Sequence, residues 1–154
     1  MNILVSACLL GFRCRYDGDS RVCAALERIS EHNRLIPFCP EIYGGLPTPR
    51  PSAEISGDRV ITRIGGDVTA QYAIGAEQAV YAAKAFSCEL CILKERSPSC
   101  GRDYIYDGTF SGKLIPGSGI AARMLMQERF NVIGESEISK YFSPEGEYTA
   151  PESI

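Results

Sequence analysis

The stretch Ile3-Leu-Val-Ser-Ala-Cys-Leu-Leu-Gly11 near the N-terminus decides the fold class. Its first four residues form a short apolar run that leads into a glycine and a polar loop, which is typical of a buried β-strand. Runs of the same kind occupy residues 34–38, 88–94 and 131–134. We therefore predict short strands at all of these positions, and the first of them delivers Cys8 directly at its end.

Helical patterns alternate with these strands. Residues 21–31 carry an apolar face after the capping pair Asp19-Ser20, residues 68–86 are rich in alanine and interrupted by Gly75, and a third pattern covers 119–129. Alternation of strands and helices is typical of a parallel sheet covered on both sides. We predict an α/β fold: a small Rossmann-like three-layer domain with a mostly parallel sheet of about four to five strands.

The remaining segments are predicted to be the loops and hairpins that connect these strands and helices. The proline-rich segment 39–54 is predicted to be a long loop, and two hairpins are predicted, one with 60–64 as an arm and one around Asp107-Gly108. A short helix precedes the C-terminus. We predict one domain over residues 1–142 and a flexible C-terminal tail over 143–154.

Composition narrows the function classes. The seven cysteines cannot all form intramolecular disulfides because their number is odd, and the N-terminus lacks the basic region of a signal peptide. No stretch approaches the roughly 20 apolar residues of a membrane helix. We therefore expect a cytoplasmic protein with reduced thiols and no membrane partner. The net charge of −3 gives no basic surface for nonspecific nucleic-acid binding.

Three cysteines stand where parallel strands are predicted to end. Cys8, Cys39 and Cys100 follow the first, second and third strands, and ligands of such sheets bind outside the carboxyl ends of the strands. Thiolates select zinc, copper(I) or iron–sulfur clusters, and three of them suit a cluster with one iron left open as a Lewis acid. The alternative is that the three are unconnected loop thiols.

The remaining thiols fit other roles. Cys88 and Cys91 are expected to point to opposite faces of one strand, so they are predicted to be core residues rather than a chelating pair. Cys23 is also predicted to be core. Arg13 and Arg15 miss the register of a phosphatase loop by one residue, because position 14 is Cys14. No phosphate-binding loop or dinucleotide fingerprint follows the first strand.

Three motifs in order resemble a known family. They are Ser6-Ala-Cys8-Leu-Leu-Gly11 with Arg15-Tyr-Asp-Gly18; Cys39-Pro-Glu41 with Gly44-Gly-Leu46 and Pro49-Arg50; and Lys94 with Ser97-Pro-Ser-Cys100-Gly101. Together they resemble the thiouracil desulfidase family, formerly a domain of unknown function numbered 523. The resemblance spans residues 1–142.

The resemblance implies a [4Fe-4S] cluster held by Cys8, Cys39 and Cys100. It also implies hydrolytic, non-redox removal of sulfur from a thiolated pyrimidine, thiouracil or a thiouridine nucleotide, with release of hydrosulfide. Glu41 would activate water, aided by burial beside Ile42, and Ser97 would position polar groups. The substrate-binding residues are predicted to be Arg15, Tyr16, Arg50 and Ser99, and Arg102 is a further candidate for a phosphate.

Several alternatives stay open at this point. Glu41 could pair with a loop arginine, and Ser97 could be a turn hydroxyl. Cys14 could replace Cys8, close the cluster as a fourth ligand, or do nothing. The chain could instead be a non-catalytic iron–sulfur or zinc-binding or redox-sensing module, or a thiol enzyme without metal. A small-molecule substrate is favoured over transfer RNA, and the sequence predicts no oligomeric state.

Overall fold

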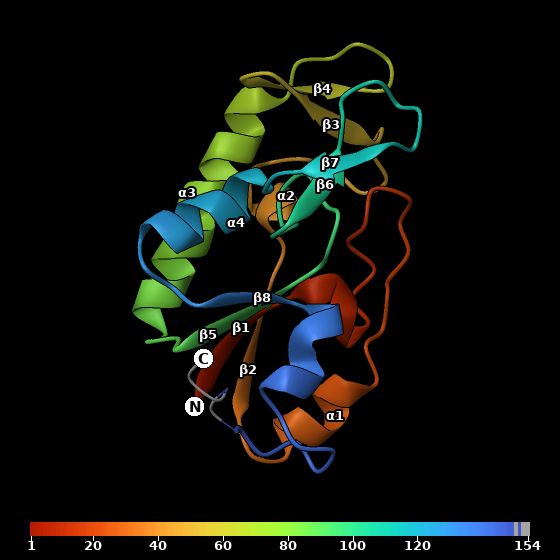
Figure 1. The fold of residues 1–154 in the computed structure, drawn as a ribbon. Helices are drawn as coiled ribbons and strands as arrows, with labels where there is room; N and C mark the ends of the chain where they lie inside the picture. The colour runs from red at the N-terminus through yellow and green to blue at the C-terminus, as the bar shows by residue number, and fades with distance from the viewer. Residues whose placement is uncertain (150, 152–154) are drawn as a thin grey trace.

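A four-stranded parallel sheet forms the centre of the molecule (Figure 1). The computed structural model describes residues 1–149 and residue 151. The strands β1 (Asn2–Ser6), β2 (Arg34–Phe38), β5 (Leu90–Leu93) and β8 (Val132–Gly134) lie in the order β2-β1-β5-β8. All the pairings are parallel, with Ile3 opposite Leu35 in one pair and Leu90 in the other.

Helices cover both faces of this sheet, because successive strand residues point to opposite sides. Leu4, Cys91 and Leu93 face the helices α3 (Thr69–Ala85) and α4 (Ile120–Gln127). Ile3 and Val5 face the other way, toward α1 (Ala25–Ser30) and the 3-10 turns η1 (Ala7–Leu10) and η2 (Glu135–Lys140). Figure 1 shows α3 and α4 on one side of the sheet and α1 on the other. The predicted three-layer α/β fold is confirmed.

Two hairpins lie beyond the carboxyl edge of the sheet, at the top of Figure 1. They are β3 (Ala53–Ser56) with β4 (Arg59–Thr62), and β6 (Tyr104–Tyr106) with β7 (Leu114–Pro116). A small separate core joins the two hairpins to α3 and contains Ile55, Val60, Tyr72 and Ile105. Both predicted hairpins are therefore present, and together they form a roof over the sheet edge.

The first predicted helix is shorter than expected. Helix α1 starts at Ala25 rather than at residue 21. The preceding segment is held against the turn after β1, because Arg21 and Cys23 donate their backbone N–H groups to the carbonyl oxygens of Cys8 and Leu9 at 2.9 Å each. These bonds keep residues 21–23 alongside that turn, where they are not helical.

The segment predicted as one long loop contains a one-turn helix, α2 (Pro40–Tyr43). Proline favours this start, since the first helical N–H needs no partner and the ring fixes φ near the helical value. Helix α2 crosses α3 at two glycines. A Cβ atom at Gly75 would lie 2.0 Å from the Pro40 carbonyl oxygen, and one at Gly44 would lie 2.1 Å from that of Gln71. Gly75 therefore serves helix packing, despite its weak helix propensity.

Cys88 and Cys91 are buried in the core, as predicted, but the expected opposite orientation is wrong. The third strand begins at Leu90, so Cys88 precedes it, and both thiols belong to the same buried cluster beneath α3. Cys23 is half-buried and packs against the other cluster, just before α1 rather than within a helix.

The predicted tail begins with an ordered turn. Tyr148 pairs with Phe142, and the Thr149 N–H donates to the Tyr141 carbonyl oxygen at 2.7 Å. These contacts involve residues of the segment 143–154, whose flexibility stays a prediction, and Ala150 and residues 152–154 lie outside the described residues. No helix in the described part of the chain is long and apolar enough to cross a membrane.

Candidate active site

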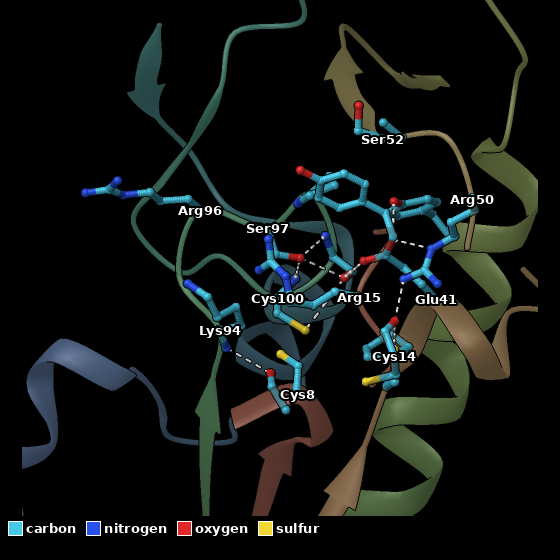
Figure 2. Close-up of a pocket in the computed structure, with 18 of the residues that line it drawn as sticks. Cys8, Cys14, Arg15, Glu41, Arg50, Ser52, Lys94, Arg96, Ser97 and Cys100 are labelled. Atoms are coloured by element: carbon cyan, nitrogen blue, oxygen red, sulfur yellow. Dashed lines mark hydrogen bonds and ion pairs between the residues drawn. The ribbon is translucent and has the colours of Figure 1, made fainter. Parts of the chain in front are cut away.

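Three cysteines meet at the carboxyl edge of the sheet. Cys39 directly follows β2, Cys8 lies in η1 after β1, and Cys100 lies in the loop after β5. Because β1 pairs with both β2 and β5, these three strand ends are neighbours. The predicted adjacency is therefore confirmed, and the sulfur atoms of Cys8 and Cys100 point toward one another in Figure 2.

Burial controls the ionisation of these thiols. Burial, together with the nearby Cys39, raises the pKa of Cys8 to about 11 and that of Cys100 to about 12. Arg15 and Lys94 oppose this effect at Cys8, while hydrogen bonds with Ser6 and Ser99 oppose it at Cys100. Thiolates clustered in this way require compensating positive charge, which a bound metal supplies as it displaces the protons.

The donor set fits an iron–sulfur cluster better than one ion. Among the described residues, no three His, Cys, Asp or Glu side chains are grouped to hold a single metal ion. The three thiols nevertheless influence one another's charge and line one cavity. Soft sulfur ligands spread around a common space are what a multi-iron cluster requires.

Cys14 lies beside this set without belonging to a strand end. The Cys39 thiol donates to the Cys14 carbonyl oxygen at 3.9 Å, and the interaction between the two thiols lowers the pKa of Cys39 and raises that of Cys14. The Cys14 carbonyl oxygen accepts from Nη2 of Arg50 at 2.9 Å. Cys14 is half-buried and lines the same cavity.

Glu41 sits in the first turn of α2, two residues after Cys39, and its carboxylate accepts hydrogen bonds from three neighbouring side chains. Its Oε1 accepts from Nε of Arg50 at 3.2 Å and from the hydroxyl of Tyr72 at 2.7 Å. Its Oε2 accepts from Oγ of Ser99 at 2.8 Å. A carboxylate offers about four acceptor positions, so one remains for a further donor such as water.

The neighbour expected to bury Glu41 is a different residue. Ile42 is exposed, whereas Tyr72 of α3 is buried against the carboxylate. Burial and the Glu41 charge raise the pKa of the Tyr72 hydroxyl well above its ordinary range, so that it stays a donor. The sequence analysis did not identify Tyr72 as a site residue, because an aromatic residue on one face of a helix is typical of the hydrophobic core.

Two serines continue the network toward Cys100. The Ser97 oxygen accepts the backbone N–H groups of Ser99 and Cys100 at 3.1 Å each, as a turn hydroxyl does. The two hydroxyl oxygens are 2.9 Å apart. The Ser99 hydroxyl has Glu41 Oε2 at 2.8 Å and the more distant Cys100 Sγ at 3.6 Å as acceptors, so its proton goes to Glu41 and Ser97 donates to Ser99. The hydroxyls therefore form a directed chain, Ser97 to Ser99 to Glu41.

The Arg50 guanidinium is buried and donates its hydrogen bonds to groups of the protein. Its side chain is 4% exposed, and besides Glu41 it donates to the carbonyl oxygens of Pro47 and Cys14 and to Oγ1 of Thr48. Four of its five N–H donors are used in this way. The alternative in which Glu41 pairs with a loop arginine is confirmed.

The other predicted cationic residues divide between two places. Arg15 lines the cavity with Tyr16, its guanidinium lies 5.5 Å from the Tyr16 ring centre, and its buried Nε has no hydrogen-bond partner among the described residues. Arg102 instead pairs with Asp103 and lines a separate hollow near η2. The structure thus brings Arg15, but not Arg102, to the cysteine site.

A cavity of about 430 Å³ is lined by the four cysteines of the site, Glu41 with its partners, Ser97 and Arg15. The cysteines and Glu41 form its floor at the sheet edge, and the hairpins contribute residues that sequence patterns did not single out: Glu54, Arg63, Tyr106 and Phe110. Lys94 is held at the wall by Glu135, with Nζ 2.7 Å from Oε1. The volume lies in the range of small-molecule sites.

Comparisons with known proteins agree with this geometry. The family model described as 2-thiouracil desulfurase matches residues 3–137. The uncharacterized protein YbbK of Bacillus subtilis (strain 168) is 42% identical over 147 residues, covering 89% of this chain and 97% of the relative. A solved structure described as the [4Fe-4S]-dependent thiouracil desulfidase TudS (DUF523Vcz) is 44% identical with a TM-score of 0.85, covering 90% of this chain and 93% of that one.

Proposed function

The chain belongs to the 2-thiouracil desulfurase family, and from this premise we propose that it removes sulfur from a thiolated pyrimidine by hydrolysis. The proposed substrates are thiouracil or a thiouridine nucleotide, and the proposed cofactor is a [4Fe-4S] cluster. The observation that carries the proposal is the meeting of Cys8, Cys39 and Cys100 beside Glu41 in one cavity. The similar TudS, described as [4Fe-4S]-dependent, supports it.

The proposed ligands are the three cysteines at the strand ends. A [4Fe-4S] cluster bound by three protein thiolates supplies one Lewis-acidic iron that can take the sulfur of a thiocarbonyl. Cys14 is not assigned as a ligand, because it lies in the loop after η1 and does not follow a strand of the sheet.

Glu41 is the proposed base for the attacking water. Its remaining acceptor position can hold a water molecule, while Arg50, Tyr72 and Ser99 fix the carboxylate. Water gives its oxygen to the ring carbon and the C–S bond breaks, so that C=S and H₂O become C=O, HS⁻ and H⁺. No electron is gained or lost, and Glu41 carries the proton.

Ser97 and Ser99 are proposed to position this carboxylate and to contact the substrate's polar edge, with Arg15 and Tyr16 on the cavity wall. The net charge of −3 and the cavity volume favour a small molecule over transfer RNA. The seven unpaired thiols suit a reducing compartment, so we expect the reaction to take place in the cytoplasm.

The first test is the cluster itself. Anaerobically purified or reconstituted protein should be brown and contain about four iron and four acid-labile sulfide per chain. Cys100→Ser should lose most of the iron, whereas Cys23→Ser, outside the cavity, should retain it. A colourless protein with full activity would refute the cluster and leave a metal-free thiol enzyme.

The second test is the reaction. Loaded protein incubated with 2-thiouracil, 4-thiouracil or 4-thiouridine monophosphate should release hydrosulfide and the oxo pyrimidine without an added electron donor. In ¹⁸O-labelled water the new carbonyl should carry the label. A loaded cluster with no turnover on any of these compounds would favour a non-catalytic iron–sulfur module.

A further inference from the structure

The roof of the cavity is held by one buried carboxylate, Glu54 of β3. Its Oε1 accepts the backbone N–H groups of Gly108 and Phe110 at 3.0 and 3.1 Å. These donors belong to the loop 107–113 that joins β6 to β7. Glu54 is 9% exposed and makes no ion pair with any described residue. Because this buried carboxylate of the β3–β4 hairpin accepts backbone hydrogen bonds from the β6–β7 hairpin, it links the two hairpins.

The loop that Glu54 holds has a strained backbone at an aromatic residue. Phe110 has φ = 55°, a left-handed conformation that is an outlier for a bulky side chain. Strain of this kind persists only where surrounding contacts impose it, and it concentrates at functional sites. The Phe110 N–H is one of the two that Glu54 accepts, so this carboxylate is one of the contacts that hold the conformation, together with the bonds from Thr109 to Asp107 within the loop.

The strained conformation places Phe110 on the wall of the active-site cavity, with Tyr106 of β6. The guanidinium of Arg63 lies 5.6 Å from the centre of the Phe110 ring and covers one face. The ring is partly exposed and lines the cavity, so a flat group bound there can contact it. A pyrimidine ring is such a group, and aromatic side chains commonly stack on bases.

We propose that the loop 107–113 is a lid on which Phe110 stacks against the substrate's pyrimidine ring, with Glu54 as the residue that positions it. This inference rests on the proposed function and adds a specificity determinant to it. A flat aromatic wall opposite the cysteines selects planar heterocycles over other thiocarbonyl compounds of similar size. It also orients the ring edge, and hence the C–S bond, toward the cavity floor.

Glu54 could instead act on the substrate through its charge, and two substitutions separate these roles. Glu54→Gln keeps an oxygen that can accept both N–H groups, whereas Glu54→Ala removes the acceptor. For a positioning residue, we expect Glu54→Ala to raise KM for 4-thiouracil about 5- to 160-fold, which corresponds to the loss of one base-stacking contact, with kcat little changed. Glu54→Gln should return KM to within about threefold of the wild type.

Phe110 is tested in the same way. Phe110→Ala should raise KM as much as Glu54→Ala does, and Phe110→Tyr should preserve it, since the ring remains. Asp58→Asn is the matched control, because Asp58 is an exposed carboxylate at the tip of the same hairpin as Glu54. All variants should keep the iron content and the cluster spectrum of the wild type.

Limited proteolysis measures the exposure of the lid independently of activity. Trypsin cleaves after Lys113, at the exposed end of the loop. We expect Glu54→Ala to speed cleavage at this bond at least fivefold, and Glu54→Gln not to. The product uracil should slow the cleavage in the wild type but not in Phe110→Ala.

Two results would contradict the proposal that the loop 107–113 is a lid positioned by Glu54. One is an active wild type with KM unchanged in Phe110→Ala and Glu54→Ala. The other is a loss in Glu54→Gln equal to that in Glu54→Ala, which would assign Glu54 a direct electrostatic role. Failure of the proposed function is different, because the loaded wild type would then release no hydrosulfide from any thiopyrimidine.

Discussion

Arg50→Met tests whether the buried guanidinium holds the site together or binds substrate. Methionine retains an unbranched apolar stem but cannot donate the four hydrogen bonds that Arg50 makes to Glu41, Pro47, Thr48 and Cys14. The substitution leaves Glu41 without the cation that it faces at 3.2 Å. We expect the principal effect to be a loss of stability.

The magnitude follows from burial. Removing one partner of a buried ion pair costs about 3–5 kcal/mol, because the other charge is left uncompensated. The Glu41 side chain is 14% exposed and keeps its bonds to Tyr72 and Ser99, so the lower end of about 3 kcal/mol applies. For a chain of this length, that loss lowers the melting temperature by about 6–12 °C.

The assay is thermal unfolding followed by circular dichroism, together with kinetics on two substrates. Arg59→Gln is the control, because its ion pair with Asp67 is exposed and should change the melting temperature by only about 1–2 °C. A positional clamp predicts equal losses of activity on 4-thiouracil and on its nucleotide. Unchanged stability with a KM defect confined to the nucleotide would refute the clamp and make Arg50 a phosphate ligand.

Three further predictions concern single residues. Glu41→Gln with an intact cluster should lower turnover at least about 100-fold, measured as hydrosulfide release, because an amide cannot accept the proton. In the cluster-free protein, Cys14→Ala should slow alkylation of Cys39 by iodoacetamide at pH 7.5 about three- to tenfold: the lost hydrogen bond lets the Cys39 pKa rise, which reduces its thiolate fraction. Gly75→Ala should lower the melting temperature by at least about 4 °C, because its Cβ would meet the Pro40 carbonyl oxygen at 2.0 Å.

Each of these has its own control. Unchanged turnover in Glu41→Gln would exclude it as the base. Cys14→Ser retains a hydroxyl donor, so Cys39 in this variant should be alkylated at a rate between those in Cys14→Ala and the wild type. Equal rates of Cys39 alkylation in all three proteins would contradict a hydrogen bond between the side chains of residues 14 and 39. Gln78→Ala, on the solvent face of the same helix, should leave the melting temperature unchanged, and an equally stable Gly75→Ala would mean that α2 can move away.

The strand pattern could be predicted because it is local. Buried strands need uninterrupted apolar runs, and those runs placed Cys8 and Cys39 at strand ends with no further information. The start of the first helix was predicted four residues too early, because its position depends on a contact that is not local. The backbone partners of Arg21 and Cys23 lie in the turn after β1, and side-chain periodicity does not reveal a distant hydrogen bond. The turn of α2 was missed inside a proline-rich stretch, although proline at the first helical position favours it.

The cysteines of the candidate site could be proposed from sequence because each follows an element that is itself recognisable. The partners of Glu41 could not. Tyr72 lies on a helix face and Ser99 in a loop, and neither position differs locally from a core aromatic or a turn serine. Only the crossing of α2 over α3 at Gly75 brings Tyr72 to the carboxylate.

By itself, the sequence determined the α/β alternation, the family resemblance and the three thiols that follow β1, β2 and β5, because hydrophobic period and motif spacing are properties of contiguous residues. The tertiary structure decided what the charged residues do. Arg50, equally able to bind a phosphate, is buried as the clamp of Glu41, and Glu54 holds the neighbouring hairpin. Such choices depend on which groups share a buried space, where an unpaired charge or donor is costly, and only the folded chain specifies that space.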